Sequence, residues 1–170
     1  LAKCYNAKDM FQDALTYARL VYTSSPSEDI MLMIAELYLA LNTPNKAIET
    51  IFKSKFSKSS RSQLAYARAN SKDSQFFKAH KIVSRLQEAD ASNPDYISLQ
   101  GEIYYDEKEY KKSLKELNRA LKIRADMPEA QYLKGIASFK INKTKQARKA
   151  FTVLTRSPDP AWKAKGHLGL

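Results

Sequence analysis

The stretch GEIYYDEKEYKKSLKEL spans residues 101–117, and GIASFKINKTKQARKAF spans residues 135–151. Both begin with glycine, place a polar residue seven positions later, and hold a small residue at the thirteenth position and a large apolar one at the end. The two stretches start 34 residues apart. A pattern that recurs at this period is typical of solenoids, whose units bury their apolar faces against their neighbours.

The same pattern extends along the rest of the chain. Small residues recur at spacings of 32 to 34 residues: Ala2, Ala35, Ala67, Gly101, Gly135 and Gly169. Three residues after each of the first five lie Tyr5, Tyr38, Asn70, Tyr104 and Ser138. Twelve residues after them lie Ala14, Ala47, Ala79, Ser113 and Ala147, and sixteen after them lie Ala18, Ile51, Val83, Leu117 and Phe151. Steps of three and four residues mark one face of a helix, and small residues suit positions where two helices cross closely.

Turn-forming residues divide each repeat into two predicted helices. Seven positions after the first five small residues lie Asp9, Asn42, Ser74, Lys108 and Asn142. Asn and Asp tolerate the left-handed conformation that such turns often need. Thr43-Pro44 reads as a helix cap followed by proline at the first helical position, and Asn93-Pro94 and Asp126-Met127-Pro128 open later repeats in a similar way. No useful length of strand-like alternation is present.

These residues resemble the tetratricopeptide repeat (TPR) family, a helix–turn–helix of 34 residues. The matching segments are Leu1-Ala2-Lys3-Cys4-Tyr5 with Ala14 and Pro26, Gly101-Glu102-Ile103-Tyr104, Gly135 with Ala147 and Phe151, and Leu168-Gly169. The family's first-helix Trp is replaced by Met31, Gln63, Ile97 and Gln131. Its position 7 holds Gln100 and Lys134 in two repeats. The resemblance covers essentially the whole chain and implies an all-α fold, a right-handed α-solenoid of about five antiparallel helix pairs.

The repeat pattern predicts one array over residues 1–170. Its divisions are a partial repeat 1 at 1–26, repeat 2 at 27–59, repeat 3 at 60–93, repeat 4 at 94–127, repeat 5 at 128–161, and the start of repeat 6 at 162–170. Both ends fall inside predicted helices, so we expect a fragment of a longer array. Truncated ends of this kind predict self-association, because a natural solenoid ends in a capping unit with a polar outer face.

Composition excludes several classes of protein. One Cys and two His among 170 residues cannot form a disulfide framework or a zinc site of the usual Cys/His type. The apolar stretch from Ile30 to Leu41 is interrupted by Glu36 and is too short to span a membrane. No signal peptide is visible. The sequence therefore predicts a soluble protein and leans towards the cytoplasm, without fixing the compartment.

The sequence predicts no enzyme. Its glycines are isolated and spaced for packing, so no nucleotide-binding loop is present, and there is no G-x-S-x-G, H-E-x-x-H or C-x-x-C motif. No set of residues supplies a nucleophile, a base and an orienting group. We therefore predict no catalytic, cofactor-binding or metal-binding residue.

The resemblance implies instead a protein-interaction scaffold whose first helices line a concave groove for a partner's peptide or helix. The identity of the partner is left open. The predicted groove residues are Leu32, Glu36, Arg61, Arg68, Lys72, Glu102, Tyr105, Tyr132, Ile136 and Phe139. For Tyr105 and Phe139 two interpretations carry equal weight: contact with a partner in the groove, or a purely structural role, packed between helices or exposed singly. Arg68 lacks the Lys and Asn companions of the clamp that binds Hsp70 and Hsp90 tails, so binding of such tails is not predicted.

The alternative function is binding of nucleic acid or another polyanion. The 29 Lys and Arg residues against 18 Asp and Glu give a net charge of +11, which attracts polyanions at low salt. Residues 50–72 contain six bases and no acid, and a second cluster comprises Lys140, Lys143, Lys145, Arg148 and Lys149. The bases are scattered over both helices of the repeats, which favours solvated outer faces over a specific nucleic-acid site.

Overall fold

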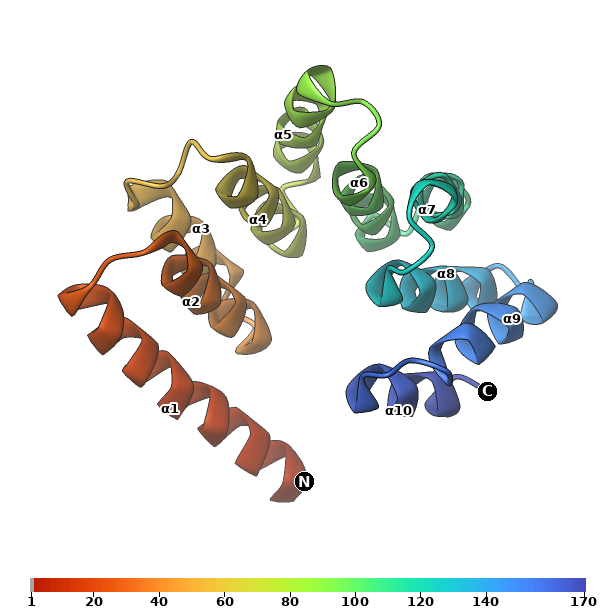
Figure 1. Ribbon diagram of the computed structural model, residues 1–170, viewed down its shortest axis with the longest axis horizontal. Helices are drawn as coiled ribbons and strands as arrows, with labels where there is room; N and C mark the ends of the chain where they lie inside the picture. Colours follow the sequence, from red (N-terminus) through yellow and green to blue (C-terminus); the bar gives the residue numbers. More distant parts are fainter. Residues whose placement is uncertain (1) are drawn as a thin grey trace. The chain divides into compact units, whose positions relative to one another are not determined.

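The computed structural model describes the backbone of residues 2–170 and the side chains of residues 10–170. Regular structure in this part of the chain is helical throughout (Figure 1), and the fold is an all-α repeat solenoid. The chain divides into two compact parts, called here the first half (Leu1–Ile82) and the second half (Val83–Leu170). The helices are α1 (Ala2–Ser24), α2 (Glu28–Ala40), α3 (Pro44–Lys53), α4 (Ser60–Lys72), α5 (Phe76–Ala89), α6 (Pro94–Asp106), α7 (Tyr110–Ile123), α8 (Pro128–Lys140), α9 (Thr144–Leu154) and α10 (Pro160–Leu168).

Four turns that join paired helices share one backbone conformation. Asn42, Ser74, Lys108 and Asn142 have positive φ angles between 56° and 65°. The N–H of the next residue donates to the carbonyl five residues earlier in every case: Thr43 to Tyr38, Gln75 to Asn70, Glu109 to Tyr104 and Lys143 to Ser138, at 2.8–2.9 Å. This bond is the mark of a Schellman helix end. The predicted left-handed turns are confirmed at these four positions.

Several helix starts are fixed by side chains that cap the first turn. Ser27 accepts a hydrogen bond from the N–H of Ile30, and Asn93 accepts one from Asp95. Pro44, Pro94, Pro128 and Pro160 each occupy the first helical position. Proline fits there because the N–H it lacks has no partner within the helix and its fixed φ suits the first turn.

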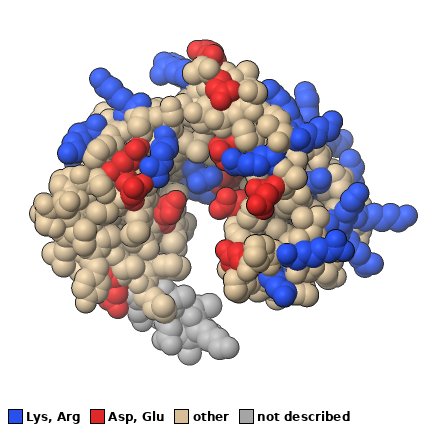
Figure 2. Space-filling model, in the orientation of Figure 1, with Lys and Arg blue, Asp and Glu red and all other residues tan. Residues whose placement is uncertain are grey.

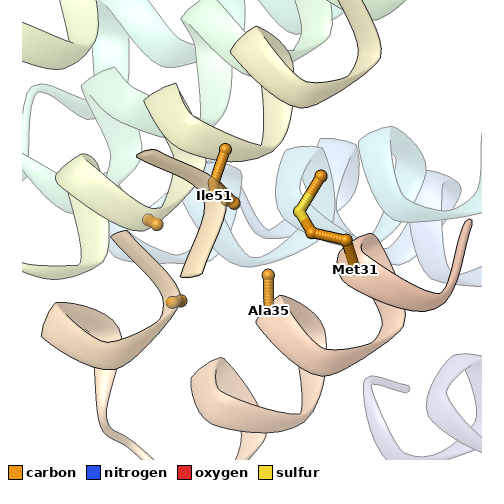
Figure 3. Packing of buried hydrophobic residues seen from close by; sticks show 5 residues of the cluster. Met31, Ala35 and Ile51 are labelled. Carbon is orange, nitrogen blue, oxygen red and sulfur yellow. The ribbon is translucent and has the colours of Figure 1, made fainter. Parts of the chain in front are cut away.

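The small-residue column packs against the apolar column sixteen residues later. A Cβ at Gly101 would lie 2.9 Å from Leu117 Cγ, and a Cβ at Gly135 would lie 2.6 Å from Phe151 Cε1. In the first half, Ala35 and Ile51 belong to one buried cluster with Met31 (Figure 3). The two columns therefore meet at the contact between the two helices of a repeat. These helix pairs are α2 with α3, α6 with α7 and α8 with α9.

Burial follows the predicted columns closely from α2 onwards. The small residues Ala35, Ala67, Gly101 and Gly135 are buried, as are Ala47, Ala79, Ser113 and Ala147. Ile51, Val83, Leu117 and Phe151 are also buried. Ala14 is exposed, in contrast to the other members of its column.

The predicted turn at Asp9 is wrong, because residue 9 lies within the continuous helix α1. Residues 2–24 contain no glycine or proline, so no residue in this stretch interrupts the helical backbone. The other predictions at Leu1, Ala2, Cys4 and Tyr5 lie outside the residues whose side chains are described.

The division of the chain into repeats stays a prediction. Helix α10 begins at Pro160, two residues before the predicted start of repeat 6. The boundary between the two halves falls inside α5, which belongs to the predicted repeat 3. Among the described residues, none of the helices combines the length and apolarity needed to cross a bilayer.

Candidate partner-binding pocket

One face of α8 carries three large apolar side chains. Tyr132, Ile136 and Phe139 are spaced four and three residues apart, so they lie on one side of the helix. Contact between Gly135 and the Phe151 ring brings α8 close to α9. The following helix, α10, is capped by Asp159, whose carboxylate accepts a hydrogen bond of 2.8 Å from the N–H of Ala161.

These three residues line a pocket of about 420 Å³, called here the α8–α10 pocket. Its walls are Tyr132, Ile136, Phe139, Phe151, Lys165, Leu168 and Gly169. Phe151 is buried at its base, while Phe139 is 63% exposed and Leu168 is 88% exposed. Large apolar side chains that gather around an open pocket mark a surface suited to binding another apolar group.

Aromatic contacts hold the pocket in shape. The Tyr132 ring lies edge-on to Phe151 with centroids 6.1 Å apart, and it lies 6.0 Å from the ring of Trp162. The Lys165 Nζ atom lies 3.9 Å from the Trp162 ring centroid and 5.4 Å from that of Tyr132. Cation–π attraction of this kind fixes the position of the ammonium group. Lys165 is the one charged residue among those that line the pocket.

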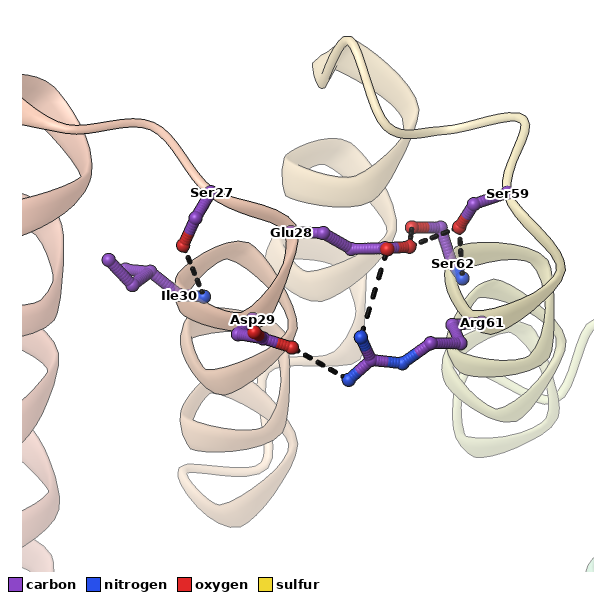
Figure 4. A network of polar contacts seen from close by, with 7 residues as sticks. All are labelled: Ser27, Glu28, Asp29, Ile30, Ser59, Arg61 and Ser62. Carbon is purple, nitrogen blue, oxygen red and sulfur yellow. Dashed lines mark hydrogen bonds and ion pairs between the residues drawn. The ribbon is translucent and has the colours of Figure 1, made fainter.

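In the first half, a polar network joins the start of α2 to the start of α4 (Figure 4). Glu28 accepts hydrogen bonds from the hydroxyls of Ser59 and Ser62, the latter at 2.9 Å. The Arg61 guanidinium lies 2.8 Å from the Asp29 carboxylate and 3.8 Å from that of Glu28. The network therefore ties the first helices of two successive repeats together at their N-terminal ends.

Hydrogen bonds from Ser59 and Ser62 hold the pKa of the Glu28 carboxyl below its ordinary value of 4.5, and the charge of Arg61 lowers it further. Because the folded pKa is depressed, the ionised carboxylate stabilises the folded state above pH 4.5. This contribution is lost as the pH falls from 4.5 through the folded pKa.

Glu28→Gln is therefore expected to lower the free energy of unfolding at pH 7, and the difference from the wild type is expected to shrink below pH 4.5. Urea denaturation at a series of pH values measures both quantities. Glu36→Gln, an exposed change on the same helix, is the matched charge control. A difference that stays constant from pH 7 to pH 3 would contradict the assignment.

Comparison with solved structures identifies the fold. A thermophilic TPR protein of Thermus thermophilus superposes with a TM-score of 0.75 over 99% of this chain and 94% of its own, at 16% sequence identity. A tetratricopeptide repeat protein from Parabacteroides merdae gives a TM-score of 0.78 over 99% of this chain and 68% of its own, at 14% identity. The chain folds as an array of tetratricopeptide repeats.

Two further comparisons match this TPR array, one to a solved structure and one to a sequence family. MamA from Desulfovibrio magneticus, residues 41 to the end, gives a TM-score of 0.58 over 93% of this chain and 97% of its own, at 16% identity. Residues 72–153 match the family described as anaphase-promoting complex, cyclosome, subunit 3. No curated protein sequence matches the chain. TPR folds generally mediate protein–protein interactions, and TPR scaffolds are generally non-enzymatic.

The other groove residues predicted from the TPR pattern differ in their surroundings. In the first half, Leu32 is half-buried against the Met31 cluster, and Glu36 is exposed. Arg61 is engaged by the two acids of α2. Arg68 is half-buried and Lys72 is exposed, at the C-terminal part of α4.

In the second half, Glu102 and Tyr105 are half-buried on α6. The centroids of the Tyr105 and Tyr110 rings lie 5.6 Å apart, so the Tyr105 side chain packs, at least in part, between α6 and α7. Phe139, for which the sequence left the same two alternatives, is exposed at the rim of the α8–α10 pocket. Whether these residues contact a partner stays a prediction.

The sequence did not predict the residues that α10 and its C-cap contribute to the pocket: Lys165 and Leu168 on the helix and Gly169 directly after it. The TPR pattern marks Leu168-Gly169 as the start of repeat 6, but the predicted groove residues end in repeat 5. Continuing the groove positions into repeat 6 gives Lys163, Gly166 and Leu170, so the pattern points to this part of the chain but not to the residues that line the pocket. Among the described residues, no group of three or more His, Cys, Asp and Glu side chains is placed to hold a metal ion.

Proposed function

We propose that this TPR array is a non-catalytic protein-interaction scaffold, and that the α8–α10 pocket receives an apolar side chain of a partner. The observation that carries the proposal is the exposure of Phe139 and Leu168 at the mouth of a pocket whose base is the buried ring of Phe151. An apolar side chain that enters the pocket removes these surfaces from water, which is favourable in proportion to the area covered. Aromatic pockets of this kind are common sites of binding hot spots.

The charge at the pocket indicates the chemistry of the partner. Lys165 is positioned by Trp162 and Tyr132, and the chain as a whole carries a net charge of +11. A carboxylate next to the inserted apolar side chain would meet this ammonium group, and long-range attraction would favour its approach. The proposed partner segment is therefore an extended peptide or a helix with an acidic residue beside an apolar or aromatic anchor.

The proposal includes the remaining predicted groove residues as contacts of lower energetic weight. In the first half these are Leu32, Glu36, Arg61, Arg68 and Lys72, and in the second half they are Glu102 and Tyr105. Arg61 is expected to contribute least, because its guanidinium already interacts with Glu28 and Asp29. Breaking those contacts to engage a partner would offset the gain.

Selection of random peptides displayed on phage, with the whole chain as the target, tests this function. Phe139→Ala is expected to weaken binding of the selected peptides by about 30-fold, the effect of a hot spot worth about 2 kcal/mol. Lys165→Glu is expected to weaken binding several-fold at low salt and less at high salt, because the interaction at the rim is screened. Fluorescence of Trp162, the single tryptophan, reports binding directly.

Phe77→Ala is the matched control, since Phe77 is an aromatic residue on α5 that is 84% exposed and does not line the pocket. The selected sequences are themselves a second readout, and we expect Asp or Glu next to an apolar residue. Peptides that bind Phe139→Ala and wild type equally well, or that show no such pairing, would contradict the proposal.

A further inference from the structure

A second pocket lies between α8 and α9, on a different face of α8 from Tyr132, Ile136 and Phe139. It has a volume of about 290 Å³ and is called here the Lys134 pocket. Its lining consists of Gln131, Lys134, Gln146, Lys149, Ala150 and Val153. Residues 131 and 134 are one helical turn apart, so both point to this side of α8.

Lys134 places a charged side chain at a position where packing between the helices favours an apolar one. The equivalent position in repeat 2 is Ile34, which is 3% exposed, and the TPR pattern has an apolar residue there. Lys134 is half-buried, and burial lowers the pKa of its ammonium group, with repulsion by Lys149 as the second cause. A charge held in such a place without an opposite charge raises the free energy of the folded state.

The pocket itself offers no carboxylate to balance these charges. None of its lining residues is acidic, and α9 contains no Asp or Glu. Two ammonium groups and two carboxamide groups are thus gathered around one cavity. All four can donate hydrogen bonds, and together they carry two positive charges when both lysines are protonated.

We propose that the Lys134 pocket binds the phosphate group of a phosphate monoester. Such a group carries a charge between about −1.5 and −2 at neutral pH and presents three acceptor oxygens, which matches the donors and the charge of the pocket. A carboxylate has one charge and two oxygens, so it would leave part of the pocket's positive charge and some of its hydrogen-bond donors unmatched. The ester can be a phosphorylated side chain of a protein or a small free phosphate compound.

Nucleic acid is the competing ligand, and the structure offers it a different surface. Figure 2 shows Lys and Arg side chains gathered over the outer side of the second half. Exposed bases on α7 and α9 outside the Lys134 pocket include Lys111, Lys112, Lys115, Lys122, Lys145 and Arg148. A phosphodiester backbone has one charge per phosphate and would follow such exposed bases. It would not require a half-buried lysine.

Nuclear magnetic resonance titrations of the whole chain test this inference with four probes. These are inorganic phosphate, a short phosphoserine peptide, the same peptide without phosphate, and a short oligo(dT). Phosphate and the phosphoserine peptide are expected to shift the signals of α8 and α9 around Lys134 and Lys149, whereas the unphosphorylated peptide is not. Tighter binding of the phosphopeptide than of inorganic phosphate assigns the ligand to a phosphorylated protein, and equal binding assigns it to a free phosphate group.

Lys134→Met and Lys149→Met are expected to weaken phosphopeptide binding at least about tenfold, as the loss of a charge-assisted hydrogen bond implies. Lys145→Met, which removes the same charge from an exposed position of α9 outside the pocket, is expected to change it much less. Thermal unfolding without ligand provides a separate readout. Lys134→Met keeps the apolar stem and removes a half-buried charge, so the variant is expected to be at least as stable as the wild type.

Two results would overturn the inference. One is phosphopeptide affinity that is unchanged in a folded Lys134→Met variant. The other is a response to oligo(dT) alone, with shifts spread over α7 and α9 and unaffected by Lys134→Met, which would assign the basic surface to nucleic acid.

Discussion

Phe151→Ala is expected to lower the free energy of unfolding by about 3–5 kcal/mol, the usual cost of truncating a buried phenylalanine. Phe151 is 5% exposed and forms a buried cluster with Ala147 and Leu154, against which Tyr132, Ile136 and Trp162 pack. A Cβ at Gly135 would lie 2.6 Å from its ring and one at Gly169 would lie 2.5 Å from it, so removal of the ring leaves a void beside both backbones. The loss is a large fraction of the roughly 5–15 kcal/mol that typically stabilises a domain.

Urea denaturation followed by Trp162 fluorescence measures this effect within the second half, because Trp162 packs against the same cluster. The matched control is Phe77→Ala, an exposed phenylalanine for which we expect a change within about 0.5 kcal/mol. A loss below about 1 kcal/mol for Phe151→Ala would contradict the packing described for α8, α9 and α10.

Gly135→Val is expected to destabilise the array by about 3 kcal/mol through overpacking. A Cβ at this position would meet three carbon atoms of the Phe151 ring at 2.6–3.0 Å. Glycine is a poor helix former, so the same substitution at an unconstrained site would stabilise the helix. The direction of the change therefore separates steric conflict from helix propensity. Lys140→Val, at an exposed position of α8, is the control.

A compensating pair sharpens this test. Repeat 2 has Ala35 and Ile51 where repeat 5 has Gly135 and Phe151. Gly135→Ala combined with Phe151→Ile should thus recover at least about 1 kcal/mol relative to the sum of the two single changes, as expected for residues in direct contact. Strictly additive effects would show that the two columns do not pack as a pair.

Much of the fold was predictable because the two helices pack against each other in the same way in successive repeats. Asn42, Ser74, Lys108 and Asn142 differ in side chain but have nearly the same φ, since the spacing between the two helices leaves one way to connect them. Glycine occurs at residues 101 and 135, where the residue sixteen positions later is Leu or Phe. Alanine occurs at residues 35 and 67, where that residue is Ile or Val. The largest of these side chains, Phe151, is thus paired with a glycine.

The features that could not be predicted depend on contacts between elements. Asp9 occupies a turn position by spacing, yet α1 continues through it, and residues 2–24 hold no glycine or proline that would interrupt the helix. Arg61 was placed correctly on the first helix of its repeat, but its pairing with Glu28 and Asp29 depends on how α2 and α4 lie beside each other. The spacing of residues within the repeat carries no information about such pairing.

The candidate sites were likewise predictable only where helical spacing alone brings residues together. The sequence identified Tyr132, Ile136 and Phe139 as one apolar face, because helical spacing alone places them together. It noted Lys134 as a departure from the family pattern without indicating that Lys149 and two glutamines surround the same cavity. The spacing between α8 and α9 had to be known before that pocket could be recognised.

Mapping a bound peptide by nuclear magnetic resonance tests the central claim most directly. With a peptide selected on the wild-type chain, the largest shifts are expected at Phe139, Lys165 and Leu168, and they should be lost in Phe139→Ala. Shifts centred on the outer faces of α7 and α9, or shifts that persist unchanged in Phe139→Ala, would contradict the claim that this TPR array binds its partner through the α8–α10 pocket.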